Sequence, residues 1–491
     1  MSLIQINNLT FKYESDYENV FENVNLNIDT NWKLGLIGRN GKGKTTFLKL
    51  LTGKLKGTGS ISKNVEVTYF PYEVKNDDIT LNIVQEICMA EDWEIIKEIN
   101  LLNANVEILY RNFSTLSGGE RVKALLAALF LKENNFLLID EPTNHLDTKA
   151  KTDIENYLKK KKGFILVSHD RSLLDSVTDH IISINNSNIN IVQGNYSVWK
   201  ENFDRQNNFE LKQNEKLQKE IEKLEIASKE SSKWSQSAEK EKQRKEANDK
   251  IDRGYLGHKA AKIMKKSKVL EERKNKNIED AKSLLKNIDK VEELKLIPSQ
   301  YDKKELIIAN NFQIVYEKPI FAPVSFVIEN GDRLILKGKN GIGKSSIIKA
   351  ILGEDIKHNG ILKINNNIKI SYVKQDTSSL QGSFKEFIQN NKVDESIFRA
   401  MLIKMGVNKK EINSNLEDLS EGQKKKVLLA KSISETADLY IWDEPLNYID
   451  IITREQIENM ILKYKPTMLF IEHDETFAER IANKTIELKE C

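Results

Sequence analysis

The sequence is poor in cysteine and holds no long apolar run, and both deficits limit what the chain can be. Only Cys88 and Cys491 occur in 491 residues, which excludes a disulfide framework and a cysteine-based metal cluster. No apolar run approaches the roughly 18 residues that a membrane-spanning helix needs. The opening residues, Met1-Ser-Leu-Ile-Gln-Ile, have the pattern of a strand and lack the features of a secretory leader. We therefore expect a cytoplasmic protein.

Charge is abundant and unevenly distributed. Charged residues make up 30% of the chain, which favours long exposed helices, and the net charge is +3. Between Lys240 and Leu270, eleven Lys/Arg stand against four Asp/Glu, a local charge of +7 that leaves −4 for the remainder. A basic segment in a slightly acidic chain predicts a nucleic-acid contact, although a solvated helical face is the usual explanation of a single charge run.

A glycine-rich stretch, Gly38-Arg-Asn-Gly-Lys-Gly43-Lys44-Thr45, matches the pattern G-x-x-x-x-G-K-[ST] in full. Its glycines let backbone N–H groups face a phosphate, and the helix expected over Thr46–Leu51 directs its positive end at the same anion. Lys44 is predicted to reach the β- and γ-phosphates, and the Thr45 hydroxyl to bind Mg²⁺. A glycine turn without nucleotide would explain neither the Lys-Thr pair nor the acids farther along.

Two adjacent carboxylates follow an apolar run in Phe136-Leu-Leu-Ile-Asp140-Glu141. The run predicts a buried strand, and ligands bind at the carboxyl ends of strands in open parallel sheets. Asp140 is suited to hold Mg²⁺ there, and Glu141 to polarise an attacking water. An acidic turn is the common explanation of such a pair, but the upstream phosphate loop favours a nucleotide site. Further strands are expected over Leu3–Leu9, Val65–Phe70 and Phe164–Val167.

The landmarks of the first half return in the second. Gly338-Lys-Asn-Gly-Ile-Gly343-Lys344-Ser345 is a second phosphate loop, 300 residues after Gly38. Ser420 follows Ser117 by 303 residues, Asp443 follows Asp140 by 303, and His473 follows His169 by 304. Four motifs at nearly one offset indicate a tandem duplication of one domain.

Both halves resemble ABC-type ATPase domains, with phosphate loop, signature loop, acidic strand end and switch histidine. The resemblance implies that two domains stack head to tail, with each ATP between the phosphate loop of one and the signature loop of the other. Its implied catalytic residues are Glu141, His169, Glu444 and His473. Its implied Mg²⁺ ligands are Thr45, Asp140, Ser345, Gln375 and Asp443. The ATP-binding residues that it implies are Tyr13, Gly38, Asn40, Gly41, Gly43, Lys44, Thr45, Thr46, Ser117, Gly118, Gly119 and Asp140 in the first half, and Tyr316, Gly338, Asn340, Gly341, Gly343, Lys344, Ser345, Ser346, Gln375, Ser420, Gly422, Gln423 and Asp443 in the second.

The two halves depart from each other at the family's glutamine that contacts Mg²⁺. The second half has Gln375, whereas the first half has Tyr72 at the matching place, 303 residues earlier. We call the site with Lys44, completed by Ser420 and Gly422, site one, and the site with Lys344, completed by Ser117 and Gly119, site two. Site one is therefore expected to bind Mg²⁺ differently or to turn over more slowly. Both catalytic glutamates are present, so neither site is expected to be inactive.

The segment between the halves predicts a long antiparallel helical hairpin. Leu217, Ile221 and Leu224 fall at helical spacing, as do apolar residues from Leu270 onward, and residues 247–257 have turn composition. Each arm of about 40 residues would be about 60 Å long, more than a spacer needs. A flexible linker would be rich in Gly and Ser, which this segment is not; a coiled spacer remains the alternative. We expect an ABC domain over 1–200, the hairpin over 201–300 and a second ABC domain over 301–491, an α/β fold with two P-loop domains in tandem.

Tandem ABC domains, the approach Gly194-Asn-Tyr-Ser and the hairpin together resemble the ABC-F family, whose hairpin enters the ribosomal E site. Only 72 residues separate Thr45 from Ser117, against 75 between Ser345 and Ser420, so the arm insertion of housekeeping members is absent. The sequence also stops 18 residues after His473, without a basic extension. The chain is therefore most similar to the antibiotic-resistance branch, and its hairpin resembles members acting against lincosamides, pleuromutilins and streptogramin A.

These features predict a ribosome-associated ATPase that uses ATP and Mg²⁺, acts as a monomer without a membrane partner, and contacts 23S rRNA and the P-site tRNA of the 70S ribosome. The hairpin residues expected to contact RNA are Arg244, Lys245, Lys250, Arg253 and Tyr255. Three alternatives remain: a housekeeping ABC-F translation factor, the ATPase subunit of a transporter, and a DNA-repair ATPase. Tyr72 and the hairpin argue against the transporter subunit. A DNA-repair ATPase of the zinc-binding kind would need more cysteines than the two present.

Overall fold

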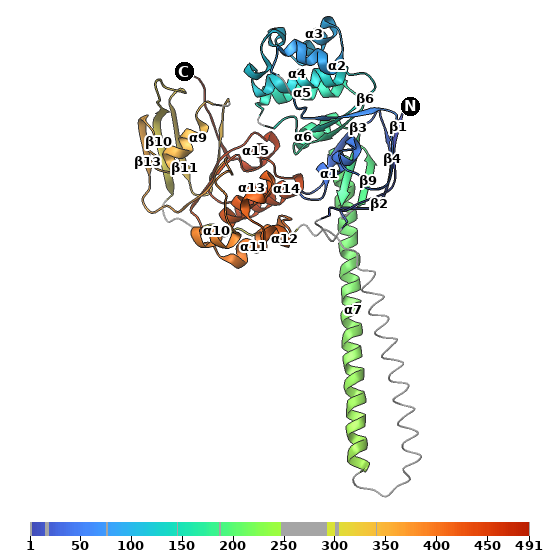
Figure 1. Cartoon of the computed structure of the whole chain (residues 1–491). Helices are drawn as coiled ribbons and strands as arrows, with labels where there is room; N and C mark the ends of the chain where they lie inside the picture. Colours follow the sequence, from blue (N-terminus) through green and yellow to red (C-terminus); the bar gives the residue numbers. More distant parts are fainter. Residues whose placement is uncertain are drawn as a thin grey trace. The chain divides into compact units, whose positions relative to one another are not determined.

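The structure is a computed structural model of the whole chain. It describes residues 2–14, 19–74, 77–144, 146–185, 188–246, 292–299, 304–339 and 341–490. Two compact units are present, one formed by residues 1–199 with 291–491 and the other by residues 200–290. The larger unit contains both halves of the duplicated sequence, and each half is an α/β assembly (Figure 1).

The first half is built on a six-stranded sheet. Its strand order is β5 (Glu66–Phe70), β6 (Asn135–Asp140), β7 (Phe164–Val167), β3 (Lys33–Ile37), β8 (His180–Asn185) and β9 (Asn188–Gln193), and the strands are parallel except for the β8–β9 pair. A smaller antiparallel sheet is formed by β2 (Phe21–Asp29), β1 (Leu3–Phe11) and β4 (Thr58–Ser62). The helices are α1 (Lys44–Thr52), α2 (Thr80–Cys88), α3 (Asp92–Leu101), α4 (Gly118–Leu131), α5 (Thr148–Lys160) and α6 (Arg171–Val177).

The apolar runs read from the sequence become the central strands. Phe136, Leu137, Leu138 and Ile139 of β6 are 0–1% exposed. Parallel strands covered on both faces carry such continuous apolar runs, because both sides of the strand are buried. The strand ends at Asp140, so the acidic pair lies at the carboxyl edge of the sheet, as the sequence predicts.

The second half repeats this plan. Its parallel sheet has the order β14 (Ile370–Val373), β15 (Leu439–Asp443), β16 (Met468–Ile471), β12 (Arg333–Lys337) and β17 (Lys484–Glu487). An antiparallel sheet is formed by β11 (Val324–Glu329), β10 (Glu305–Ile314) and β13 (His358–Ile364). The helices are α9 (Lys344–Ile351), α10 (Phe384–Asn391), α11 (Glu395–Lys404), α12 (Lys409–Ile412), α13 (Glu421–Ser434), α14 (Ile451–Tyr464) and α15 (Glu475–Ile481).

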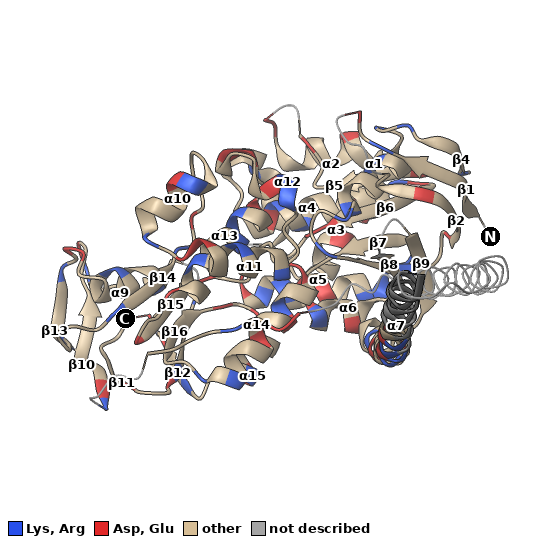
Figure 2. Ribbon diagram, turned by 90° about the horizontal axis from the view of Figure 1, so that it is seen from below, with Lys and Arg blue, Asp and Glu red and all other residues tan. Residues whose placement is uncertain are grey.

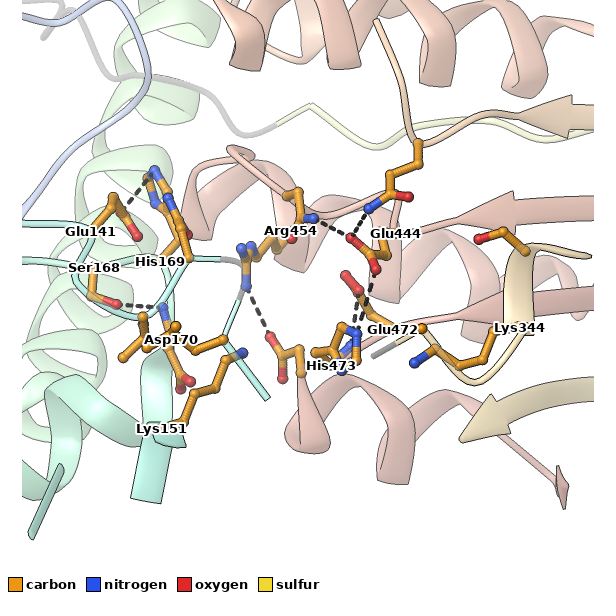
Figure 3. Close-up of a pocket in the computed structure, with 18 of the residues that line it drawn as sticks. Glu141, Lys151, Ser168, His169, Asp170, Lys344, Glu444, Arg454, Glu472 and His473 are labelled. Atoms are coloured by element: carbon orange, nitrogen blue, oxygen red, sulfur yellow. Dashed lines mark hydrogen bonds and ion pairs between the residues drawn. The ribbon is translucent and has the colours of Figure 1, made fainter. Parts of the chain in front are cut away.

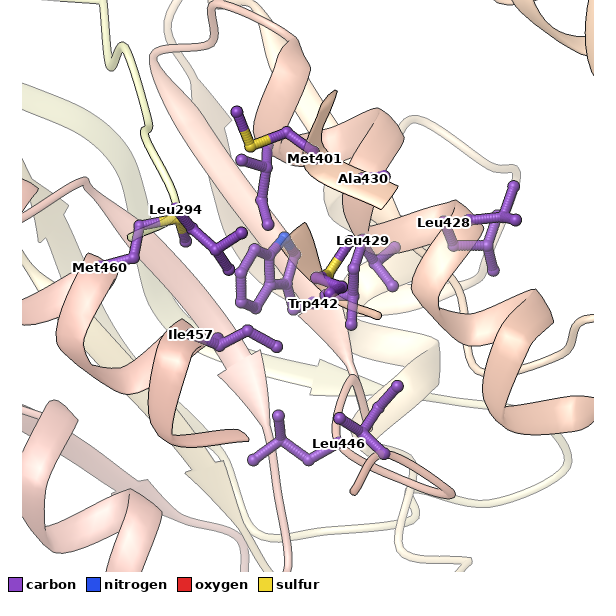
Figure 4. Close-up of a cluster of buried hydrophobic side chains, with 14 of the residues drawn as sticks. Leu294, Met401, Leu428, Leu429, Ala430, Trp442, Leu446, Ile457 and Met460 are labelled. Carbon is purple, nitrogen blue, oxygen red and sulfur yellow. The ribbon is translucent and has the colours of Figure 1, made fainter. Parts of the chain in front are cut away.

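Trp442, the residue before Asp443, anchors the core of the second half. The indole is fully buried among apolar side chains that include Leu429, Ile457 and Met460 (Figure 4). Its Nε1–H donates to Ser432 Oγ at 2.9 Å, so the polar tip of the ring is also satisfied. This packing fixes the end of β15, and with it the position of the second acidic pair.

The segment after the first half begins as one long helix. The side chain of Asn195 accepts from the backbone N–H of Val198, at the start of α7 (Tyr196–Glu246), which runs for 51 residues. At 1.5 Å per residue the helix is about 77 Å long, which exceeds the arm expected from the sequence. The predicted turn, the return arm and Lys250, Arg253 and Tyr255 lie outside the described residues. For Arg244 and Lys245 only the helical backbone is described.

Both basic and acidic residues are scattered over the described parts of the two halves (Figure 2). Of the helices that the structure describes, none combines the length and the apolar character needed to span a membrane.

Candidate nucleotide sites

The first phosphate loop connects β3 to α1. Its glycines allow the tight path: Gly43 has φ +96°, and a Cβ atom there would lie 2.7 Å from Val20 Cγ1. Lys44 folds back over the loop and donates from Nζ to the Gly38 carbonyl at 2.7 Å and to Asn40 Oδ1 at 3.1 Å. Burial lowers the pKa of Lys44, against the opposing influence of Asp450 and Glu141. The first phosphate loop thus encloses the ammonium group of Lys44.

The second phosphate loop has the same form. Lys344 Nζ donates to the carbonyls of Gly338 at 2.7 Å and Lys339 at 3.1 Å, and Gly343 has φ +95°. Asn340 lies outside the described residues. The hydroxyls of Tyr13 and Tyr316 lie beside the helices that follow the loops, 2.8 Å from Thr46 Oγ1 and 3.0 Å from Ser346 Oγ. The structure therefore places both tyrosines next to the loops with which the sequence grouped them.

Both catalytic-glutamate candidates have an unusual backbone conformation. Glu141 has φ +50° and Glu444 has φ +46°, the left-handed region that residues with side chains seldom adopt. Each lies directly after the last strand residue, Asp140 or Asp443. Strained conformations of this kind gather at functional sites, and here the turn sets each glutamate beside the switch histidine of its own half.

In site two, the residues around Glu444 hold its carboxylate in the ionised form. Gln375 Nε2 donates to Glu444 Oε2 at 2.8 Å, Asn447 Nδ2 donates to the same atom at 2.7 Å, and His473 Nε2 lies 3.4 Å from Oε1. Burial raises the pKa of Glu444, but the contacts with His473, Asn447 and Gln375 outweigh it and lower the pKa overall. In this structure Gln375 thus faces the glutamate.

Asp443 and Ser345 fit a Mg²⁺ ion. Asp443 Oδ1 is buried and has no hydrogen-bond partner among the described residues, while a hydrogen bond joins the carboxylate to Ser345. Mg²⁺ takes oxygen ligands, commonly one or two carboxylates together with phosphate oxygens. The buried Asp443 Oδ1 and the neighbouring Ser345 hydroxyl are oxygen ligands of this kind. Burial raises the pKa of Asp443, which a cation would reverse.

Site one has the same acidic pair and histidine as site two, but their contacts and pKa shifts differ. Tyr69 donates its hydroxyl to Asp140 Oδ2 at 2.7 Å. Glu141 Oε1 lies 3.4 Å from His169 Nε2. Burial, followed by the charge of Asp140, raises the pKa of Glu141 to about 8, and burial lowers the pKa of His169 well below its usual range. The two glutamates are therefore tuned in opposite directions, in line with the asymmetry expected from Tyr72 and Gln375.

A lysine that sequence reasoning missed supports this difference. Lys425 of α13 is 2% exposed, and its Nζ donates to the carbonyls of Lys374 at 2.9 Å, Gln375 at 3.1 Å and Asp443 at 3.4 Å. It thereby ties the segment that bears Gln375 to the end of β15. The matching position in the first half, 303 residues earlier, is Val122. Only a comparison of the halves position by position would have revealed it.

The structure brings together the elements predicted to form site one. Asn40 of the first phosphate loop donates from Nδ2 to the Tyr448 carbonyl at 2.7 Å and from its backbone N–H to Asp450 Oδ2 at 3.3 Å. Gly422 of the second signature loop lies against the same asparagine, since a Cβ atom on it would be 2.6 Å from Asn40 Nδ2. Ser420 and Gln423 form a capping box at the start of α13.

The corresponding elements of site two are not brought together. A cavity of about 420 Å³ lies before the second phosphate loop and is bordered across from it by Glu141, Asn144, Ser168 and His169 of the first half (Figure 3). Ser117 and Gly119 are not among its described lining residues. Ser117 instead caps α4, and the closest atoms to a Cβ on Gly119 belong to Leu146 and Ala150 of its own half.

Comparison with known proteins agrees with this architecture. The family model described as ABC transporter matches residues 21–144 and 321–447. The ATP-binding protein Uup of Buchnera aphidicola subsp. Acyrthosiphon pisum is 31% identical over 99% of this chain and 80% of its own length. The ribosome protection protein VmlR of Bacillus subtilis is 28% identical over 96% and 85%. The erythromycin resistance ATP-binding protein MsrA of Staphylococcus epidermidis is 29% identical over 98% and 97%.

A solved structure shares the fold. The archaeal ribosome recycling factor aABCE1, in complex with the ribosomal stalk protein aP1, superposes with a TM-score of 0.60 over 98% of this chain and 87% of that chain, at 19% identity. The fold and the paired phosphate loops define an ATPase with two ABC domains in tandem. With relatives matched along nearly its whole length, the chain belongs to the ABC-F family.

Proposed function

We propose that this ATPase binds the ribosome in the cytoplasm and protects it from antibiotics acting at the peptidyl-transferase centre. The observation that carries the proposal is similarity along nearly the whole chain to one relative named as a ribosome protection protein and another named for erythromycin resistance. The 51-residue helix α7, which leads into the basic segment, supports it. Lys and Arg there would neutralise RNA phosphates, and Tyr255 would stack on a base.

In the proposed cycle, one group of residues holds Mg²⁺ in each site and the two glutamates activate the attacking water. Asp443 and Ser345, with Gln375, would hold Mg²⁺ in site two, and Asp140 with Thr45 would hold it in site one. Bound Mg²⁺ would neutralise charge on the phosphates. Glu141 and Glu444 would orient and deprotonate the attacking water, each beside its histidine. ATP would close the two sites, and hydrolysis would release the protein from the ribosome.

In the proposed mechanism the hairpin enters from the ribosomal E site, beside the P-site tRNA, and displaces the drug from 23S rRNA. The expected drugs are lincosamides, pleuromutilins and streptogramin A. The protein would act as a monomer, its two domains pairing within one chain, and would need no membrane partner.

Trapping the ATP-bound state tests the proposal. Glu141→Gln combined with Glu444→Gln leaves both phosphate loops intact but removes both proton acceptors. We expect this double variant to co-sediment with 70S ribosomes in ATP, and wild type to dissociate as it hydrolyses ATP. Lys44→Ala combined with Lys344→Ala is the matched control, since it should not bind in ATP. Absence of the double glutamine variant from the ribosome fraction would refute the release step.

Drug susceptibility separates the proposal from a housekeeping translation factor. The gene is expressed in a sensitive host, and inhibitory concentrations are compared for a lincosamide, a pleuromutilin, a streptogramin A and, because one relative is named for erythromycin, a macrolide. Increased resistance to at least one class supports protection. Unchanged values for all four, in cells where the trapped variant binds ribosomes, would favour the translation factor.

A further inference from the structure

The lysine three residues after each signature motif takes a different partner in each half. In α4, Lys123 Nζ pairs with Asp153 Oδ2 at 2.6 Å, and Asn103 Nδ2 donates to Asp153 Oδ1 at 3.0 Å. Its counterpart in α13, Lys426, pairs with Asp450 Oδ2 at 2.7 Å and donates to the Met405 carbonyl at 2.7 Å. The first lysine thus binds the middle of the following helix, and the second binds the residue that caps it.

Two sequence differences between the halves account for the change of partner. The positions 303 residues after Asp153 and Asn103 are Gln456 and Gly406. Gln456 carries no charge for Lys426, and its Nε2 donates to the carbonyls of Glu292 at 2.7 Å and Lys404 at 3.1 Å. Its Oε1 is buried without a hydrogen-bond partner among the described residues. With no carboxylate at 456, the nearest acid available to Lys426 is Asp450.

The change of partner has a consequence at site one. Asp450 is 0% exposed, and the Lys426 side chain is 1% exposed. The oxygen that Lys426 holds, Asp450 Oδ2, is also the acceptor for the backbone N–H of Asn40 in the first phosphate loop, at 3.3 Å. Arg39, next to Asn40, packs beside Gly406, the counterpart of Asn103: its Cδ and Nη1 lie 3.5 Å from where a Cβ of residue 406 would be, which is ordinary van der Waals contact. In the first half the matching Asp147 is exposed and only caps α5.

We infer that Lys426 is a positioning residue for site one: by holding Asp450 against Asn40, it fixes the first phosphate loop in its ATP-binding form, and Lys123 has no equivalent role at site two. The inference rests on the proposed assignment of site one and adds to it the residue that makes the two sites unequal. A buried ion pair fixes geometry well because separating the two charges inside the protein would leave each of them buried and uncompensated.

The test isolates site one and separates affinity from stability. In a Lys344→Ala background, which disables the second phosphate loop, binding of a fluorescent ATP analogue with Mg²⁺ reports site one of the full chain. Lys426→Met should weaken this binding at least tenfold, whereas the matched Lys123→Met should change it less than twofold. Melting temperatures are recorded for both, since each substitution leaves one buried carboxylate unpaired.

Gln456→Asp keeps the proposal testable if Lys426→Met does not fold. It restores the carboxylate found at Asp153 and should draw Lys426 away from Asp450, so that site-one affinity falls; its melting temperature is recorded as well, because the carbonyls of Glu292 and Lys404 lose their donor. Unchanged affinity in Gln456→Asp, or in a folded Lys426→Met, would overturn the inference. Lys44→Ala in the same background serves as the reference. If Lys44→Ala retained binding, the assignment of site one would be wrong; if only Lys44→Ala lost binding, the role of Lys426 would be wrong.

Discussion

At the scale of single residues, the two glutamates after the acidic strands differ most. Glu444 receives three polar contacts that lower its pKa, while burial and Asp140 raise the pKa of Glu141 to about 8. At neutral pH, Glu444 is therefore the better prepared proton acceptor. From Tyr72 and Gln375 the sequence predicts a difference in Mg²⁺ binding and turnover between the sites; the opposite directions of the two glutamate pKa shifts became visible only in the fold.

We predict that the single variants lose unequal shares of ATPase activity. Glu444→Gln should remove most of the turnover at pH 7, because the remaining Glu141 is largely protonated there. Glu141→Gln should leave most of it, because the remaining Glu444 is ionised. The steady-state rate of each purified variant, with and without ribosomes, measures this. Equal losses would show that the sites contribute alike.

Glu472 makes stability depend on pH. Burial raises its pKa from 4.5 to about 7. Between these values the unfolded chain has lost the proton and the folded chain retains it, so the free energy of unfolding falls as pH rises through this window. Glu472→Gln should remove this loss, so its melting temperature relative to wild type should increase from pH 5 to pH 8.

Glutamine is a suitable replacement because it has the size of glutamate without the titration, and its one amide oxygen can still accept from either the backbone N–H of Leu446, which donates to Oε1 at 3.3 Å, or that of His473, which donates to Oε2 at 3.2 Å. A difference in melting temperature that stays constant across this pH range would rule out the proposed titration.

At the scale of secondary-structure elements, α13 differs from α4 by a buried lysine that holds three carbonyl groups. Lys425→Met should destabilise the second half by about 1–3 kcal/mol, because buried acceptors lose their donor. It should also lower site-two turnover, measured in a Glu141→Gln background, by loosening the segment with Gln375. Lys424→Met on the same helix is the control: Lys424 pairs with half-exposed Glu421, and such pairs contribute about 0–1 kcal/mol. Equal effects of the two substitutions would contradict the role of Lys425.

The basic segment of residues 240–270, which begins within the last turns of α7, is predicted to carry drug protection. Arg253→Ala with Tyr255→Ala should leave the ATPase rate of the purified protein unchanged and sharply reduce resistance in cells, because phosphate contacts supply affinity while the shape of the segment decides what is displaced. Arg205→Ala, on the exposed part of α7 beside Glu201, should preserve both. Full resistance in the double variant would reduce the segment to a spacer.

The elements show how far sequence reasoning reaches. β7 has the predicted limits, and β6 extends the predicted Phe136–Ile139 by one residue at each end, because continuous apolar runs identify buried parallel strands. Local motifs likewise placed both phosphate loops. The contacts of Lys425 and Lys426 were not predictable, since each depends on carbonyls or acids that only the fold brings near. For the same reason, the sequence did not predict that the second phosphate loop faces Asn144 and His169 and not Ser117.

At the scale of the whole molecule, the two halves are connected by buried charges. Arg171 of α6 pairs with Glu458 of α14, at 3.3 Å from Nη1 to Oε2, and Arg480 of α15 reaches the same carboxylate at 2.6 Å. Tyr196 donates to Glu455 at 3.0 Å. The Glu458 carboxylate is fully buried, and the two guanidinium groups keep its charge from being left uncompensated. The contact between the halves is therefore specific.

Because the halves belong to one chain, this contact forms within a molecule. We predict that ATPase activity per molecule stays constant over a roughly thousandfold dilution, whereas a dimer of separate chains would lose activity near its dissociation constant. Activity that declines on dilution, with adsorption to surfaces controlled, would show that two chains cooperate.

The duplication at an offset of 303 residues also determines how such a protein can change over generations. In an enzyme assembled from two identical chains, every mutation enters both sites at once. Here a codon change such as the one that separates Gln456 from Asp153 enters one half only. Selection can therefore act on each site separately, so that one site can gain affinity for ATP while the other keeps its rate of hydrolysis.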